Sequence, residues 1–206
     1  MTAMDETKIE TIKNWLGNGS INIFGSPFSG KDTQGSCLAE MLGGKLIGGG
    51  AILRSNIVPK HVHHHIKSGK LAPIEDYLEI VAPFLKQPFL ADRPLIMSAV
   101  GRWHGEEEAI IQAATEASHP LKAVIFLELS EDSIWRRWEL SAHRKDRGER
   151  SDDTAEALKI RLKEYKEKTL PVIDFYRKKG LVIEIDGNAS KDEITAEIID
   201  KLASVE

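Results

Sequence analysis

The segment that most constrains the fold of this chain is a glycine-punctuated loop at residues 25–33, with the sequence GSPFSGKDT. A short apolar stretch at residues 21–24 runs straight into it and is typical of a buried strand. A helix of about residues 31–42 is expected to begin at the lysine. Backbone N–H groups in such a loop converge on phosphate oxygens, and the helix N-terminus adds partial positive charge. The order strand, loop and helix therefore predicts a phosphate-binding site and disfavours a simple turn before an ordinary helix.

The residue types in the loop suit the phosphates of a nucleoside triphosphate. Gly25 and Gly30 permit a tight turn and a close approach of phosphate that a side chain would block. Lys31 follows with the spacing G-x-x-x-x-G-K, in which the lysine neutralises the outer phosphates. Asp32 stands where that motif has Ser or Thr, and the hydroxyl comes one place later. The predicted ATP contacts in the loop are Gly25, Ser26, Pro27, Phe28, Ser29, Gly30, Lys31, Asp32 and Thr33.

The rest of the chain alternates between strand-like and helix-like segments. Further buried strands are expected at residues 45–47, 94–97, 123–129 and 181–185, with helical stretches between them. This alternation predicts a five-stranded, mainly parallel sheet with helices on both faces. We therefore expect an α/β P-loop NTPase fold in a single domain of residues 1–206. Apolar residues at helical spacing add a leading helix within residues 1–18, which is expected to pack on the core.

Composition excludes several other classes of protein. The net charge of −4 argues against a general nucleic-acid binder, which would need a basic face. The single cysteine, Cys37, rules out an internal disulfide framework and fits a reducing compartment. No apolar run approaches the roughly 20 residues that cross a bilayer, and the first residues lack the apolar core of a signal peptide. We expect a cytoplasmic monomer that binds neither nucleic acid nor membrane.

With Thr33 and Gln34 added, the loop GSPFSGKDTQ resembles that of adenylate kinases and related nucleoside monophosphate kinases. The likeness continues in order, through Gly69-Lys70-Leu71, the run RSDD at residues 150–153 and Asp186-Gly187, to the C-terminus. The resemblance implies a kinase that transfers the γ-phosphoryl group of Mg-ATP to a nucleoside monophosphate. It also implies a monophosphate-binding lobe at about residues 47–82 and a short lid at about residues 141–152.

The resemblance assigns roles to five arginines, which lie on four different elements. Arg54 and Arg102 correspond to the monophosphate-binding arginines, with Gly49 and Glu106 near the acceptor base. Arg137, Arg150 and Arg161 correspond to residues on the triphosphate side, and Gly187 to the backbone that contacts adenine. Guanidinium groups stay charged and engage phosphate oxygens in pairs, which suits a transition state that shares charge between two phosphates. The predicted catalytic residues are Lys31, Arg102, Arg137, Arg150 and Arg161.

Three departures from the family pattern leave alternatives open. Ala51 and Ser98 stand where the family often has aspartates that help to hold hydrated Mg²⁺. Asp32 and Thr33 are the remaining candidates for the metal, although a carboxylate at Asp32 also suits the first turn of a helix. Glu106 replaces an amide near the base, so guanine or cytosine competes with the default, AMP. The lost aspartates also permit a nucleotide-binding protein without turnover.

Two conspicuous groups of side chains are interpreted as structural. Four histidines at residues 61–65 crowd one turn of an expected helix and cannot all converge on one metal ion, so a solvated helix face is favoured. Trp135 and Trp138, three residues apart on another expected helix, are more typical of buried packing than of base stacking.

Overall fold

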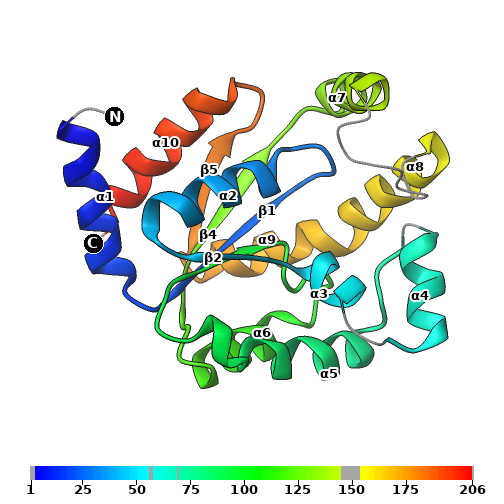
Figure 1. Ribbon diagram of the computed structural model, residues 1–206. Coiled ribbons are helices and arrows are strands. Elements are labelled where there is room, and N and C mark those ends of the chain that lie inside the picture. Colours follow the sequence, from blue (N-terminus) through cyan, green and yellow to red (C-terminus); the bar gives the residue numbers. More distant parts are fainter. Residues whose placement is uncertain (1–2, 56–57, 69, 145–153, 206) are drawn as a thin grey trace.

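The computed structural model describes residues 3–55, 58–68, 70–144 and 154–205, and it has a parallel five-stranded sheet at its centre (Figure 1). The strand order is β2-β3-β1-β4-β5, and every neighbouring pair is parallel. The predicted α/β fold is thereby confirmed, and the expected strand boundaries lie within two residues of the observed ones. The strands are β1 (Ser20–Gly25), β2 (Lys45–Gly48), β3 (Leu95–Ser98), β4 (Leu121–Glu128) and β5 (Val182–Asp186).

Helices cover both faces of the sheet (Figure 1). The described helices are α1 (Ala3–Leu16), α2 (Lys31–Leu42), α3 (Gly49–Ser55), α4 (Lys60–Lys67), α5 (Ile74–Leu85), α6 (Glu107–Glu116), α7 (Glu131–Arg144), α8 (Ala155–Glu164), α9 (Leu170–Lys178) and α10 (Lys191–Ala203), with a short 3₁₀ turn, η1 (Pro88–Leu90). Within the described ranges, no helix is long and apolar enough to cross a membrane.

Successive side chains along each strand point to opposite faces of the sheet, so the apolar core is divided into clusters on the two faces. Ile21 and Ile23 of β1 pack with α1, α2 and α10, whereas Phe24 packs with α9 on the opposite face. Strand β4 repeats this division, because Ile125 and Phe126 belong to opposite clusters. Successive side chains of a strand point to opposite faces, so strands that are apolar on both faces require two helical layers.

The predicted leading helix is α1, and it lies beside α10 near the chain ends (Figure 1). Ile9, Ile12 and Leu16 are buried at helical spacing in the same cluster as α10. A salt bridge between Lys8 Nζ and Asp200 Oδ1, at 2.7 Å, joins the exposed sides of the two helices.

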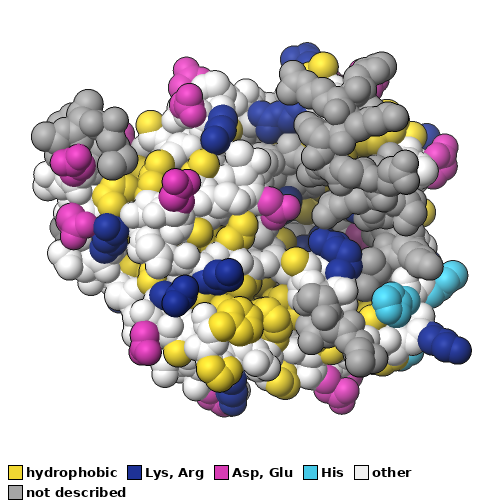
Figure 2. All heavy atoms as spheres, viewed as in Figure 1, with side chains coloured by type: hydrophobic (Ala, Val, Ile, Leu, Met, Phe, Trp, Pro, Cys, Tyr) yellow, Lys and Arg dark blue, Asp and Glu magenta, His cyan; other side chains and the backbone are white. Residues whose placement is uncertain are grey.

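Three helices, α3, α4 and α5, fill the connection between β2 and β3 and share an apolar cluster that includes Ile52, Val62 and Val81. They span the residues for which the monophosphate-binding lobe is expected. Histidine side chains gather at the surface in the region of α4 in Figure 2; His61, His63 and His64 are exposed, His65 is partly buried, and His61 Nε2 is 2.7 Å from Asp76 Oδ2. The expected lid at residues 141–152 falls mostly outside the described residues.

One turn of π-helix, η2 (Tyr165–Thr169), lies between α8 and α9. Its closing hydrogen bond runs from Leu170 N to Tyr165 O, five residues back. Pro171 explains the turn, because proline has no amide hydrogen and its ring repels the carbonyl four residues earlier in a regular helix. The turn also lets Thr169 Oγ1 donate to the carbonyl oxygen of Arg102 at 2.9 Å.

Candidate functional site

The loop predicted to bind phosphate lies between β1 and α2, at the carboxyl edge of the sheet. Open parallel sheets bind ligands at this edge. Gly25 has φ 156°, and a Cβ at this position would lie 2.5 Å from Ser29 Oγ and 2.7 Å from Leu127 O. Only glycine fits there, because both the backbone conformation and the neighbours exclude a side chain.

Lys31 extends back over the loop from the first residue of α2. Its Nζ donates to the carbonyl oxygens of Ser26 at 2.7 Å and Gly25 at 3.0 Å. The ammonium group therefore lies where the loop and the helix N-terminus both favour an anion.

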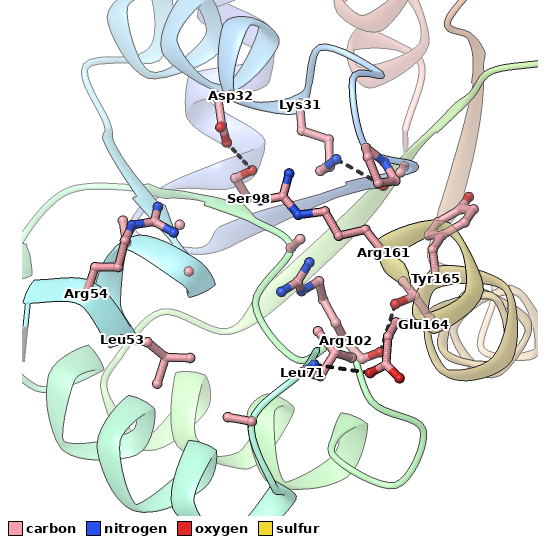
Figure 3. Close-up of a pocket in the computed structure, with 18 of the residues that line it drawn as sticks. Lys31, Asp32, Leu53, Arg54, Leu71, Ser98, Arg102, Arg161, Glu164 and Tyr165 are labelled. Carbon is pink, nitrogen blue, oxygen red and sulfur yellow. Dashed lines mark hydrogen bonds between the residues drawn. The ribbon is translucent and has the colours of Figure 1, made fainter. Parts of the chain in front are cut away.

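A cavity of about 430 Å³ opens beside the loop, and its described lining is strongly cationic (Figure 3). The side chains of Arg102 and Arg161 point into its centre, and Lys31 enters from the loop side. The described lining contains five cationic side chains and two carboxylates: Lys31, Arg54, Lys70, Arg102 and Arg161, and Asp32 and Glu164. Such a surplus of positive charge from several elements suits a ligand with more than one phosphate.

Arg102 follows β3 and lies deep in this cavity. Solvent reaches its side chain through the open mouth, yet desolvation by the protein around the guanidinium lowers its pKa below the usual value. The positive charges of Arg161 and Arg54 lower this pKa further. The guanidinium nevertheless stays protonated, because its ordinary pKa is so high. An anion bound among the three arginines would relieve their mutual repulsion.

Glu164 connects the cavity to the helices between β2 and β3. Its Oε2 accepts a hydrogen bond from Leu71 N at 3.1 Å (Figure 3) and another from Lys168 Nζ at 2.7 Å. Lys168 Nζ also lies 3.7 Å from the centroid of the Trp103 ring, in the loop that carries Arg102. The far wall of the cavity is thus tied to the end of α8.

Arg137 is not among the described residues that line the cavity, but it contacts the phosphate loop from α7. Its Nη1 lies 3.3 Å from the carbonyl oxygens of both Phe28 and Ser29. Its Nη2 donates to Gly187 O at 2.6 Å. Arg137 therefore joins the loop to Gly187, the two segments expected to contact ATP.

Phe28 is a feature of the loop whose structural role the sequence did not indicate. Its φ is 64°, in the left-handed region, which costs a non-glycine residue about 1–2 kcal/mol. Its ring is 9% exposed and packs with Ile134 of α7 and with Leu158 and Leu162 of α8. Burying a phenylalanine side chain contributes roughly 2 kcal/mol, which offsets the strain.

The two positions that depart from the family pattern both line the cavity, but only Ser98 contributes a polar group. Ser98 Oγ donates to Asp32 Oδ1 at 2.6 Å, across the gap between β3 and α2 (Figure 3). The Asp32 carboxylate thus turns toward the end of β3, while Thr33 is exposed. Ala51 presents only a methyl group to the cavity.

The residues expected near the acceptor base are not among the described residues that line the cavity. Glu106 is 3% exposed, and its Oε2 accepts from Trp103 N at 3.1 Å. Burial raises its pKa to about 7. A Cβ at Gly49 would lie 2.6 Å from Tyr77 Oη. The Tyr77 hydroxyl therefore fills the space that a side chain at position 49 would need. Tyr77, which also accepts from Gly101 N at 3.1 Å, was not singled out from the sequence because it resembles any other core aromatic.

The structure brings together Lys31, Asp32, Arg54, Arg102 and Arg161 around one cavity. Arg150 lies outside the described residues.

The two tryptophans of α7 pack edge to face, with ring centroids 5.7 Å apart, and both lie against the cluster that contains Phe28. This confirms their interpretation as packing residues.

A phosphate loop at the carboxyl edge of a parallel sheet, facing a cavity lined with arginines, defines a P-loop phosphotransferase. The family model for adenylate kinase matches residues 23–181. The chain belongs to the adenylate kinase family, and the resemblance inferred from its motifs is confirmed.

Curated relatives extend this match over most of the chain. The adenylate kinase of Thermus thermophilus is 31% identical over 184 residues, which cover 87% of this chain and 94% of that protein. The adenylate kinase of Parvibaculum lavamentivorans is 33% identical over 85% of this chain and 88% of that protein. The adenylate kinase of Bacteroides thetaiotaomicron is 32% identical over 89% of this chain and 99% of that protein.

Proposed function

We propose that this phosphotransferase transfers the γ-phosphoryl group of ATP to AMP. One observation carries the proposal: Lys31 and the phosphate loop line the same cavity as Arg54 and Arg102, which come from other elements. In this proposal the loop, Arg137 and Gly187 bind ATP. Arg54 and Arg102 bind the acceptor monophosphate in a lobe formed by α3, α4 and α5.

In this proposal Arg161 stabilises the γ-phosphoryl group during its transfer. Its side chain points into the centre of the cavity, toward Arg102 (Figure 3). Phosphoryl transfer requires in-line positioning and stabilisation of shared charge rather than a protein nucleophile. The arginines and Lys31 supply this stabilisation, and Arg150 is proposed to add to it from residues outside the described ranges.

AMP is the preferred acceptor in this proposal because the curated relatives at 31–33% identity are adenylate kinases. The alternative acceptors are CMP, UMP and GMP. Glu106 in place of an amide suggests guanine or cytosine from the sequence, but its side chain is buried, accepts from Trp103 N and is not among the described residues that line the cavity, so AMP is retained as the preferred acceptor.

The residues beside the loop fit Mg²⁺. Mg²⁺ prefers oxygen ligands and keeps several of its waters, which carboxylates and hydroxyls hold by hydrogen bonds. Asp32, with Ser98 bonded to it, offers a carboxylate and a hydroxyl at the cavity, whereas Thr33 follows in the chain but is not among the described residues that line the cavity. When bound, the ion would supply neutralisation of the phosphate charges. Asp32 and Ser98 would orient the waters around it, and Asp32 would replace part of the charge absent at positions 51 and 98.

The test is a coupled assay with ATP and each of AMP, CMP, UMP and GMP, with and without Mg²⁺. The proposal expects the highest kcat/KM for AMP and a dependence on Mg²⁺. A higher value for another monophosphate would reassign the acceptor. Tight binding of ATP without transfer to any of the four would identify a nucleotide-binding protein without turnover.

A further inference from the structure

We propose that Phe28 is a positioning residue, which holds α7 against the phosphate loop and thereby aims Arg137 for phosphoryl transfer. The inference rests on the proposed role of Arg137 in that reaction. It concerns a residue that neither the motif nor the family match assigns to any task beyond contact with ATP.

The first observation is that Phe28 contacts α7 in two ways. Its ring packs against Ile134, and its carbonyl oxygen accepts a hydrogen bond from Arg137. Ile134 and Arg137 are three residues apart, so they lie on the same side of the helix. The loop residue thus bonds an arginine and packs against the apolar side chain one turn before it.

The second observation is the backbone conformation of Phe28. A φ of 64° favours glycine, so a phenylalanine at this position is strained. The ring is nevertheless buried among side chains from α7 and α8, which come more than a hundred residues later in the chain. The cluster holds Phe28 in its strained conformation, and this conformation turns its carbonyl oxygen toward Arg137.

The third observation is the second attachment of Arg137. The same guanidinium donates to Gly187 O at 2.6 Å and to Ser29 O at 3.3 Å. These bonds fix the guanidinium at its tip, and the Phe28 cluster fixes the helix from which it projects. A displacement of about 1 Å in a catalytic group lowers a rate by on the order of a hundredfold. Loss of the ring should therefore affect the reaction more than it affects the fold.

The experiment compares kcat in a double-mutant cycle of Phe28→Gly and Arg137→Ala, with Mg-ATP and AMP. Glycine relieves the backbone strain and removes the ring. We expect Phe28→Gly to lower kcat by roughly tenfold to a hundredfold. In the Arg137→Ala background it should cause no further loss, because residues that act through one another are non-additive.

Two controls separate positioning from stability. Phe28→Leu keeps an apolar side chain in the cluster and should retain most of the kcat. Ile198→Ala creates a cavity in α10, within the cluster that contains β1 and α1, and should lower Tm while leaving kcat near the wild-type value. All rates are measured well below the Tm of each variant.

Several results would overturn the inference. Equal loss of kcat from Phe28→Gly in both backgrounds would mean that Phe28 does not act through Arg137. A lower Tm with unchanged kcat would make it an ordinary core residue. If Arg137→Ala alone leaves kcat unchanged, the proposed role of Arg137 fails first. If AMP is not an acceptor, the proposed function fails instead. The same double-mutant cycle can then be measured with the Kd for Mg-ATP in place of kcat.

Discussion

Replacing Glu106 with glutamine is expected to stabilise the protein above neutral pH and to change little in acid. The Glu106 side chain is 3% exposed, and burial raises its pKa from 4.5 to about 7. In the unfolded chain the carboxyl group loses its proton near the lower value. Between the two values the folded protein binds more protons than the unfolded chain, so stability falls as pH rises through this window. The full decrease in the free energy of unfolding, reached above pH 7, amounts to roughly 3 kcal/mol.

Glutamine has no charge to bury and still offers an oxygen to Trp103 N, so Glu106→Gln should escape this loss. Urea unfolding at about pH 5 and about pH 8 measures the difference between variant and wild type. The gain should be below about 1 kcal/mol at the lower pH and about 3 kcal/mol at the higher one. Glu108→Gln, which changes an exposed glutamate of α6 without removing a buried charge, is the matched control, and its effect on stability should be much smaller than that of Glu106→Gln. A variant that is equally destabilised at both pH values would refute the argument from burial.

Three further predictions concern the cavity. Lys31→Ala should lower kcat by roughly a hundredfold to a thousandfold with an unchanged circular dichroism spectrum, because the charge facing the transferred group is lost; near-normal turnover would remove Lys31 from catalysis. Arg102→Ala should raise the KM for the monophosphate more than that for ATP, and equal rises in a two-substrate kinetic analysis would contradict the assigned division of the site. Asp32→Gly should raise the Mg²⁺ concentration needed for half-maximal rate and weaken Mg-ATP binding in calorimetry relative to metal-free ATP; unchanged titrations would leave Asp32 as a residue of the helix start.

The parts of the fold that the sequence predicted depend on local patterns. The loop at residues 25–33 was located because its strand, glycines, lysine and helix are contiguous. The strands were located because residues buried on both faces form unbroken apolar runs. The ends of the first two helices followed from the glycines that come directly after them.

What the sequence could not supply depends on contacts between distant residues. Asp32 and Ser98 are 66 positions apart, and neither alone indicates that their oxygens meet. The left-handed conformation of Phe28 is maintained by side chains on α7 and α8, so it has no local signal. The burial of Glu106 was equally hidden, because the sequence places this glutamate near the acceptor base and carries no local signal that its carboxyl group is buried.

The π-helical turn η2 determines the rotational relation of the two helices that it joins. In a regular helix each residue advances the side chains by about 100°. Deleting one residue from 165–169 would therefore rotate α8 by that angle relative to α9. Leu162 would leave the Phe28 cluster and Arg161 would leave the cavity, or else Tyr176 would leave its place against the sheet. Chain length within this single turn therefore constrains where Arg161 and the Phe28 cluster lie, and a deletion there should be less well tolerated than any single substitution at the same residues.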